Sequence, residues 1–503
     1  MDVEILNNAK ELIELEKEEE QQAREAKAQA LLNLPKSMKE VEQLLAKAGL
    51  DNSQYGEDGK RKKLPPYKVA EVMRKNWYFC LIGNNEDNSP IYCYDIETGL
   101  YKYSQTLLTR LVSKVEPMLN KNQRADVLDL LKSELELKQP TNDKRFIPVN
   151  NGIFDLKLKR LLDFTPKRYY TSKIATNYND SAVAPYLDGF TIDDWLDEIA
   201  CHDSDTVRLY WELMYEAINP NYTRGKMAIL LGEGNNGKGT FQQLLRNLIG
   251  ESNVTSLKPN EFSERFKPAN LLGAVCNIGD DISNAYLDEV SNLMSVVTGD
   301  TITVEHKGKQ AFDITVSLLC IFSGNDLPRA RNKTQGWYRR LLIIPFDADF
   351  NGQAENRKIK QEYIKNQQLL EYVLYRVLNL EPFEHFTVPK ASQKALEAYK
   401  EDNDYFYSYV VSVYIPKGYH ELEQVPLPIL KRWLEEYTED IGIQKANLYG
   451  FGKKVTAILN KQTEHRYTVK NGFTSQAEKK IIDPLGFHDE SLKGRPKGIH
   501  KEY

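Results

Sequence analysis

A glycine-rich turn holds the residues of this chain that are best suited to chemistry. The turn comprises Gly232, Glu233, Gly234, Asn235, Asn236, Gly237, Lys238, Gly239 and Thr240. An apolar run at 227–231 precedes it, and a helix-forming segment follows. The backbone N–H groups of such a turn converge on one concavity, the helix adds the positive end of its dipole, and Lys238 supplies a mobile cation. The natural occupant is an anion with several clustered charges, such as a nucleoside triphosphate.

The turn departs from the common G-x-x-x-x-G-K-[ST] pattern after Lys238. Gly239 stands where Ser or Thr normally offers a hydroxyl to Mg²⁺, and the hydroxyl of Thr240 comes one residue later. Either Thr240 reaches the metal or water takes that position. The alternative is a chance glycine turn before a surface helix, and the apolar run and helix on the expected sides argue against it.

From 224 to about 350, strand-forming runs alternate with helix-forming segments, which predicts a parallel sheet with helices on both faces. Polar side chains end two of the later apolar runs, each of which predicts a buried strand. Asp280 and Asp281 follow the run at 271–278, and carboxylates there can hold Mg²⁺ and polarise an attacking water. Asn325 follows the run at 314–322, where an amide can orient that water by hydrogen bonding. Taken singly, the aspartates also suit a solvated turn, and Gly-Asn is a common turn pair.

Two adjacent arginines precede a fourth apolar run at 341–346. Arg339 or Arg340 can supply an arginine finger to the γ-phosphate held by a neighbouring subunit, where it spreads the charge of the transition state. Considered alone, the two arginines could equally be surface residues beside a strand, with no role in catalysis.

Residues 297–312 predict a β-hairpin with a basic tip. Val304 and Phe312 flank His306, Lys307 and Lys309. Lysines bind phosphates without reading bases, so such a tip suits a contact that follows a nucleic-acid backbone. A solvated surface hairpin is the alternative.

The C-terminal residues have their own charge balance. Residues 445–503 contain twelve Lys or Arg and six Asp or Glu, whereas the whole chain has a net charge of −5. We expect a helix at 427–437, a second at 445–459 with Lys453 and Lys454 on its surface, and a β-wing after residue 466. This order predicts a winged-helix DNA-binding domain, for which origin recognition is the natural role. A small basic domain that contacts protein is the alternative.

The order of these motifs resembles that of the superfamily 3 helicases. The similarity is greatest to the branch with poxvirus and satellite-phage primase-helicases and the replication proteins of phages and phage-inducible islands. Apolar and polar residues alternate on both sides of the Glu-Thr-Gly turn in IYCYDIETGLYKY (91–103), which predicts a β-hairpin. This hairpin and the segment IPVNNGIFDL (147–156) are similar to the N-terminal region of that branch, so the resemblance spans roughly residues 67–400. It implies an AAA+-type P-loop ATPase core that uses ATP and Mg²⁺ and assembles as a hexamer around single-stranded or forked DNA.

The resemblance also assigns roles to residues. Lys238 and Thr240 would bind phosphates, Asn325 would be the sensor, and the hairpin of Lys307 would enter the central channel. The residues implied in ATP hydrolysis are Lys238, Asp280, Asp281, Asn325, Arg339 and Arg340. Thr240 and Asp280 would serve the metal. Arg265 matches an Arg-Phe pair of the branch and is a weaker candidate for a nucleotide contact.

Composition sets further bounds. A chain of 503 residues is too long for one core. We expect an α/β protein with a charged helix and linker at 1–60, an α/β scaffold or docking domain at 61–189, the ATPase core at 190–389 and the basic domain at 390–503. The helix expected near 5–33 is either solvated or an arm for oligomerisation or docking.

Cysteine usage and hydropathy indicate the compartment. The five cysteines include no C-x-x-C pair, which argues against a disulfide framework and a structural zinc site. No apolar run approaches about 18 residues, so we expect a soluble protein without a membrane partner, in the cytoplasm of a bacterial host cell.

We expect an ATP-dependent replicative helicase of a phage or mobile element, which translocates on single-stranded DNA as a hexameric ring. Three other functions compare less well with the sequence. An ATP-switched initiator would assemble on an origin and pass it to a host helicase with little unwinding of its own. A small-molecule kinase would share the glycine-rich turn but would not need the basic hairpin. Primase activity is not expected, because no zinc ribbon or carboxylate cluster precedes the turn. A separate primase or polymerase is a candidate partner.

Overall fold

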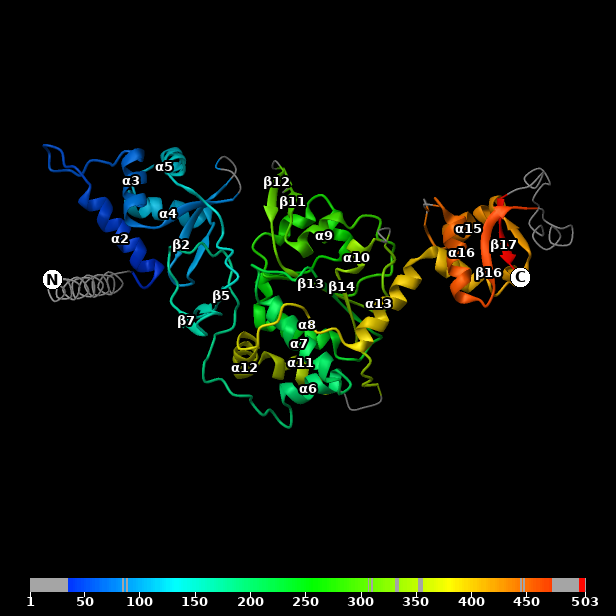
Figure 1. Cartoon of the computed structure of the whole chain (residues 1–503). Helices are drawn as coiled ribbons and strands as arrows, with labels where there is room; N and C mark the ends of the chain where they lie inside the picture. The colour runs from blue at the N-terminus through cyan, green and yellow to red at the C-terminus, as the bar shows by residue number, and fades with distance from the viewer. Residues whose placement is uncertain are drawn as a thin grey trace, which may run out of the picture. The chain divides into compact units, whose positions relative to one another are not determined.

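The structure is a computed structural model, and the chain divides into two compact units (Figure 1). One unit comprises residues 1–141 and 162–173, and the other comprises residues 142–161 and 174–503. The described residues are 35–83, 86, 89–305, 307–308, 311–330, 334–351, 356–443, 446, 448–472 and 497–502. The helix expected near 5–33, His306 and Lys309 lie outside them. No helix of the described part is long and apolar enough to cross a membrane.

The first unit packs helices on one small sheet of order β3-β2-β1-β4. The strands are β1 (Phe79–Ile82), β2 (Ile91–Asp95), β3 (Leu100–Lys102) and β4 (Leu137–Lys138). The helices are α2 (Met38–Asp51), α3 (Pro66–Asn76), α4 (Gln105–Val115) and α5 (Lys121–Ser133). The hairpin expected at 91–103 is confirmed, since β2 and β3 are antiparallel with Tyr94 opposite Tyr101. Its turn ends at Gly99, whose φ of +73° favours glycine.

The second unit is built around a five-stranded parallel sheet of order β14-β8-β13-β10-β9. The strands are β8 (Met227–Leu231), β9 (Val254–Thr255), β10 (Cys276–Gly279), β13 (Leu319–Gly324) and β14 (Leu341–Pro345). Their apolar runs are continuous because helices cover both faces. This confirms the parallel sheet expected from the sequence.

Each face of this sheet has its own set of helices. One face carries α6 (Ile192–Ile199), α7 (Ser204–Ala217), α8 (Lys238–Ile249) and α12 (Gln367–Leu378). The hairpin of β5 (Phe146–Val149) and β6 (Gly152–Asp155), followed by β7 (Arg160–Leu162), joins the same core through Ile147 and Phe154. The other face carries α9 (Ser291–Thr298), α10 (Gln335–Tyr338) and α13 (Lys390–Asn403). The short helix α11 (Arg357–Gln361) contacts α8.

The boundaries of two expected strands are wrong. The run at 271–278 forms a strand only from Cys276, because Leu271 still belongs to a 3-10 turn (Lys267–Leu271). The apolar run at 314–322 belongs to two strands, because Ile314 and Thr315 end β12 (Phe312–Thr315) and β13 begins at Leu319. β12 pairs with β11 (Thr301–Val304) in the expected hairpin. Continuous hydrophobicity conceals the turn between the two strands, since each strand buries residues in the same core.

Helix α13 is hydrogen-bonded to two other segments of the sheet unit. The Asn403 side chain accepts from the Ala330 N–H (2.8 Å) and donates to the Tyr338 hydroxyl (3.1 Å). The Tyr399 hydroxyl donates to the carbonyl of Pro328 (2.9 Å). The helix is thereby joined to the loop after β13 and to α10.

A small subdomain follows α13. Its elements are α14 (Tyr405–Tyr409), a π-helical turn (Val410–Tyr414), β15 (Gln424–Pro426), α15 (Leu427–Asp440), α16 (Phe451–Gln462), β16 (Arg466–Asn471) and β17 (Lys497–Glu502). The three strands form an antiparallel sheet of order β15-β17-β16. The second helix begins at Phe451 and not at 445, because Gly450 ends the preceding turn with a φ of +68°.

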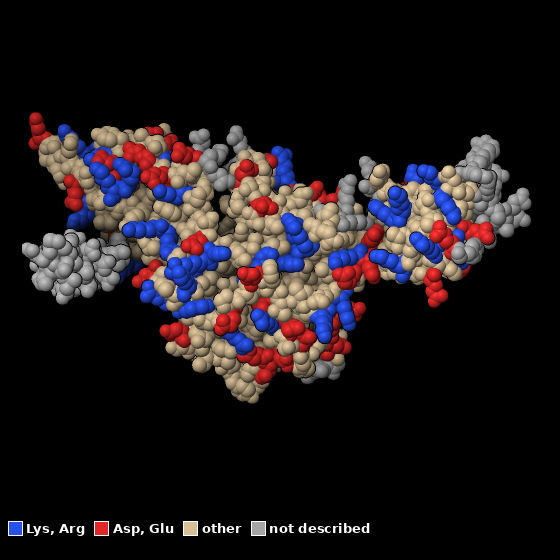
Figure 2. Space-filling model, in the orientation of Figure 1, with Lys and Arg blue, Asp and Glu red and all other residues tan. Residues whose placement is uncertain are grey.

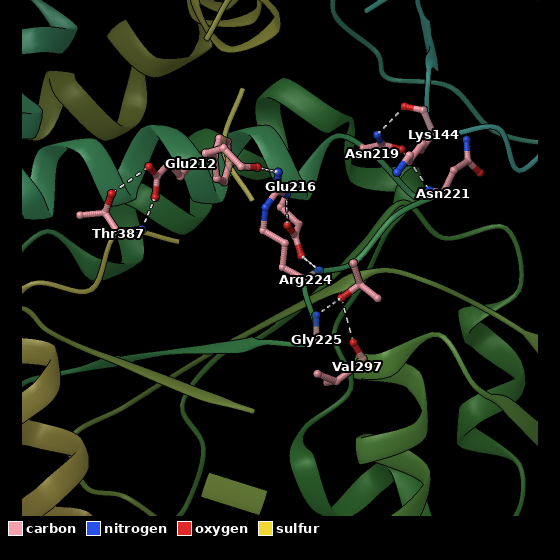
Figure 3. A network of polar contacts seen from close by, with 11 residues as sticks. Lys144, Glu212, Glu216, Asn219, Asn221, Arg224, Gly225, Val297 and Thr387 are labelled. Carbon is pink, nitrogen blue, oxygen red and sulfur yellow. Dashed lines mark hydrogen bonds and ion pairs between the residues drawn. The ribbon is translucent and has the colours of Figure 1, made fainter. Parts of the chain in front are cut away.

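A buried ion pair fixes the start of the interior strand β8 (Figure 3). The Arg224 guanidinium pairs with Glu216 of α7, donates to the carbonyl of Phe383 (2.8 Å) and lies 3.8 Å from the centre of the Phe383 ring. Burial raises the pKa of Glu216, and the hydrogen bonds from Arg224 oppose that rise. One turn earlier on α7, Glu212 accepts from the N–H (2.6 Å) and hydroxyl of Thr387. Helix α7, the start of β8 and the 383–387 segment are therefore held together.

We predict that Arg224→Ala lowers the free energy of unfolding of the second unit by about 3–5 kcal/mol, because it leaves the Glu216 carboxylate buried without its partner. Denaturant titration with circular dichroism measures this loss. Lys431→Ala removes a half-exposed pair with Glu435 and should cost no more than about 0.5 kcal/mol. Equal losses in both variants would contradict the central role of the Arg224 pair.

Candidate functional site

The glycine-rich turn joins the end of β8 to the start of α8 and is held from two sides. Gly237 has a φ of +90°, and a Cβ at this position would lie 2.7 Å from Cγ2 of Ile199 in α6. The buried Asn236 amide donates to the carbonyls of Glu233 (2.6 Å) and Phe346 (2.9 Å), the latter directly after β14. Close approach and side-chain hydrogen bonds thus fix the path of this turn.

Lys238 is folded over its own turn. Its ammonium donates to the carbonyls of Gly232 and Glu233 (2.8 Å to the latter) and to the Asn236 side chain (3.3 Å). Burial lowers the pKa of Lys238, and the negative charge of Asp280 counteracts this. The lysine is half-buried, and among the described residues its ammonium is hydrogen-bonded only to neutral oxygens. A phosphate can replace these acceptors, because a hydrogen bond between an ammonium and a charged oxygen is stronger than one to a neutral oxygen.

Gly239 leaves an open position in the first turn of α8. The nearest heavy atom to a Cβ built there is Nζ of Lys360, at 3.6 Å, and Lys360 belongs to α11. The N–H of Thr240 donates to the carbonyl of Gly237 (3.1 Å), so Thr240 continues the helix. A side chain at 239 would meet no steric obstacle and would lie beside a second lysine.

Strand register brings Asp280 next to Ser323. Gly279 at the end of β10 lies opposite Phe322 in β13, so the next residues of the two strands are also neighbours. The Ser323 hydroxyl donates to Oδ1 of Asp280, and the N–H of Asp281 donates to the same oxygen (2.9 Å). Asp280 and Asp281 are both exposed, and Lys258 donates to the carbonyl of Asp281 (2.8 Å).

The carboxylates suit a metal that is shared with a phosphate. No group of three or more His, Cys, Asp or Glu residues that could hold a metal occurs within the described ranges. Mg²⁺ is usually held by one or two carboxylates together with substrate phosphates and water, and Asp280 beside the glycine-rich turn fits that donor set.

Asn325 lies at the same edge of the sheet. It follows β13, whose last residue Gly324 is opposite Leu231 at the end of β8. The exposed Asn325 side chain and Leu231 line a cavity of about 770 Å³ that also reaches Tyr399 and Asp402 of α13. The glycine-rich turn, Asp280 and Asn325 therefore meet at the carboxyl ends of three adjacent strands.

Arg339 and Arg340 are at the opposite end. β14 runs parallel to β8, and the first residues of the two strands, Leu341 and Met227, lie opposite each other. The arginines directly precede Leu341. They are therefore separated from the glycine-rich turn by the five residues of β8, a length of about 16 Å. The Arg340 guanidinium donates to the carbonyl of Gly336 (2.6 Å), and burial lowers its pKa. Arg339 is exposed. Neither arginine joins the residues at the carboxyl edge of its own sheet.

The basic hairpin keeps its predicted shape. Lys307 and Gly308 are exposed at the tip between β11 and β12. Beside this tip, directly after β11, Glu305 accepts two hydrogen bonds from the Arg265 guanidinium (2.7 and 3.0 Å). Arg265, the weaker nucleotide candidate, is thus paired with the hairpin.

Lys453 and Lys454 are exposed in the first turn of α16, as expected. Nζ of Lys454 lies 4.7 Å from the centre of the Phe406 ring. Figure 2 shows further Lys and Arg side chains over the face of this subdomain that α15, α16 and β16 form.

Sequence reasoning missed the contacts of four side chains that the structure brings to these places. Asn236 ties the turn to β14, Lys360 lies beside Gly239, Ser323 contacts Asp280, and Arg224 fixes the start of β8. Ser323 adjoins the Gly-Asn pair that the sequence analysis singled out, and this proximity was the only local signal. Asn236 and Lys360 contact residues more than 100 positions away in the sequence, and Arg224 pairs with a residue of α7, so no local pattern indicates these contacts.

Two protein families match parts of the chain. Residues 68–201 match a family described as "D5 N terminal like", and residues 230–340 match a family of unknown function, DUF5906. The second match begins within β8 and ends at Arg340, so it contains the glycine-rich turn, Asp280 and Asn325.

Two relatives carry the name "Putative helicase". The protein 121R of Invertebrate iridescent virus 3 is 25% identical over 230 residues, which are 43% of this chain and 24% of that protein. The protein 184R of Invertebrate iridescent virus 6 is 22% identical over 233 residues, 44% of this chain and 24% of that protein. The matched region spans about a quarter of the length of these relatives.

Among solved structures, the apo A form of the NrS-1 C-terminal region is 12% identical to this chain. The match covers 87% of this chain and 99% of that chain, with a TM-score of 0.47.

We predict opposite effects for side chains added at two glycines of the turn. Gly239→Ser should leave α8 intact or stabilise it by about 0.5 kcal/mol, since serine is the better helix former and meets only Lys360. Gly237→Ala should destabilise the turn by about 1–3 kcal/mol because of the positive φ and the contact with Ile199. Hydrogen exchange of the α8 amides measures both. Equal protection in the two variants would contradict this difference.

Proposed function

We propose that this protein is an ATP-dependent DNA helicase of a phage or mobile genetic element, with an AAA+-type P-loop core of the superfamily 3 kind. The observation that carries the proposal is the shared edge at which the glycine-rich turn, Asp280 and Asn325 meet. After β8 the chain forms β9, β10 and β13, which all lie on one side of β8 in the sheet. It then forms β14 on the other side, so the strand order reverses at β8. Ligands of open parallel sheets bind at the carboxyl ends of strands where the order reverses in this way.

At this edge each residue has a chemical role. Lys238 and the N–H groups of the turn bind the β- and γ-phosphates, and Thr240 donates to a phosphate or to the water shell of the metal. Mg²⁺, when bound, neutralises the charge that develops on the phosphates. Asp280 and Asp281 orient the metal and polarise the attacking water, and the Asn325 amide holds that water in line.

The position of the arginines supports sites shared between subunits. Arg339 is exposed and is separated from the turn of its own chain by the length of β8, so its guanidinium can reach only the γ-phosphate of a neighbour. Head-to-tail contacts of this kind close into rings when the rotation permits. We propose a hexameric ring, in which Arg339, or Arg340 after release from Gly336, completes each site.

We propose that the ring translocates along single-stranded DNA. The exposed Lys307 at the hairpin tip supplies a contact to the phosphate backbone that does not depend on sequence, and His306 and Lys309 remain predicted contacts beside it.

The C-terminal subdomain is proposed to bind duplex DNA at an origin. Its order of helix, strand, two helices and two strands supports a winged-helix domain in which α16 is the recognition helix. Lys453 and Lys454 lie at the exposed start of that helix, where they can contact phosphates.

The second candidate function is an ATP-switched origin-binding initiator. The C-terminal subdomain, with Lys453 and Lys454 exposed at the start of α16, favours it, because such a domain can select a site without any translocation. Full-length protein that binds origin duplex and hydrolyses ATP but does not separate a fork would favour the initiator over the helicase.

We predict that Lys238→Ala and Lys307→Ala separate hydrolysis from unwinding. Lys238→Ala should reduce ATP hydrolysis about 100-fold or more and abolish unwinding, because it removes a charge that stabilises the transition state. Lys307→Ala should retain basal hydrolysis and lose fork unwinding, since it contacts only DNA. Phosphate release and strand separation, with and without single-stranded DNA, measure these effects. Lys394→Ala, which changes an exposed lysine of α13, is the control. Hydrolysis that ignores DNA, with no unwinding by the wild type, would refute the helicase.

We predict that an equal mixture of Lys238→Ala and Arg339→Ala proteins regains hydrolysis although each is inactive alone. One variant supplies an intact turn and the other an intact arginine, so about a quarter of the interfaces in mixed rings are complete. A mixture of Lys238→Ala with Asp280→Asn should not recover, because both residues belong to the same edge of one chain. No recovery in the first mixture would contradict the shared site.

A further inference from the structure

Ser323 is an almost fully buried hydroxyl at the edge proposed to hydrolyse ATP. It is 2% exposed and donates to Oδ1 of the exposed Asp280. The N–H of Asp281 lies 3.4 Å from the Ser323 oxygen. The only charged side chain that Ser323 contacts among the described residues is therefore the carboxylate proposed to serve the metal.

Gln242 stands behind this serine. It lies one helical turn after Lys238 on α8 and is 3% exposed, and its amide oxygen lies 3.5 Å from the Ser323 oxygen. Its amide nitrogen has no hydrogen-bond partner in the described part of the chain. A buried amide without a partner costs about 1–3 kcal/mol, so its position requires an explanation.

The single proton of the serine hydroxyl explains how the Gln242 amide must be oriented. A serine hydroxyl has one proton, and Ser323 gives that proton to Asp280, so the same hydroxyl cannot also donate to Gln242. The orientation of an amide is assigned from its hydrogen bonds. With the amide nitrogen turned toward Ser323, Gln242 donates to the serine oxygen, and the amide oxygen takes the position that is left without a partner. The three side chains then form one series of hydrogen bonds from Gln242 to Ser323 to Asp280.

This series fixes one oxygen of the carboxylate and leaves the other available. Oδ1 of Asp280 accepts from the Ser323 hydroxyl and from the Asp281 N–H. Within the described ranges, Oδ2 has no hydrogen bond, so it is the oxygen that can face a cation beside Lys238. The orientation of a ligand carboxylate is commonly set by such buried partners.

We propose that Ser323 and Gln242 are positioning residues that orient the Asp280 carboxylate toward Mg²⁺ bound with the nucleotide. This inference rests on the proposed function. It also accounts for Gly239, because a chain without the usual hydroxyl ligand depends more strongly on the orientation of its carboxylate.

The test measures binding of a fluorescent, non-hydrolysable ATP analogue as Mg²⁺ is titrated, and again in EDTA. Ser323→Ala should raise the Mg²⁺ concentration for half-maximal binding about 10-fold and leave binding in EDTA unchanged, since loss of such a partner typically weakens metal affinity 10–100-fold. Ser323→Thr keeps the hydroxyl and should restore the wild-type value. Gln242→Met, of similar size, should shift the Mg²⁺ requirement in the same direction by a smaller factor.

Each outcome separates the inference from the function on which it rests. An unchanged Mg²⁺ requirement in Ser323→Ala, or an equal loss of binding with Mg²⁺ and in EDTA, would overturn the positioning role while leaving the ATPase intact. A wild-type protein that binds no nucleotide under either condition would overturn the proposed function itself. Lys238→Ala, which should weaken binding in both conditions, shows that the assay reports on the phosphate contact.

Discussion

The parallel register of β8, β13 and β10 is the constraint on which the rest of the second unit depends. Gly324 opposite Leu231 and Phe322 opposite Gly279 bring the three strand ends to one edge, and only this alignment sets Asp280 beside Ser323 and near the glycine-rich turn. A slip by one residue would reverse the face of every side chain in the slipped strand. It would move the residues of each core to the opposite face, where they would not fit the helices that pack there, and it would separate the polar residues at the edge. Folding and the candidate site therefore require the same alignment.

The buried Arg224–Glu216 pair contributes to that alignment from the other end of β8. Burying two charges is costly, and an apolar replacement can be as stable, so the pair is better understood as a means of specifying position than as a source of stability. Its hydrogen bonds and its contact with Phe383 define where β8 starts relative to α7. Asn236 supplies the corresponding restraint after the strand, through Phe346.

Local patterns predicted much of this arrangement. The glycine-rich turn, the parallel sheet, the basic hairpin and the exposed lysines of α16 could all be read from short segments, because each depends on neighbours in sequence. The division of residues 314–322 between two strands and the start of α16 at Phe451 could not, since tertiary packing decides them. The pairing of Arg265 with Glu305 and of Ser323 with Asp280 joins residues about 40 apart, and only register reveals such pairs.

Helix α13 has a mechanical consequence for the sheet unit. One side chain, Asn403, is hydrogen-bonded both to Ala330, in the loop that follows Asn325, and to Tyr338, directly before Arg339. These two segments belong to opposite ends of the parallel strands. A displacement of the loop that contains Ala330 would therefore move Asn403 and strain its hydrogen bond to Tyr338 of α10. The Asn403 side chain thus couples the position of the loop after Asn325 to that of the residues directly before Arg339.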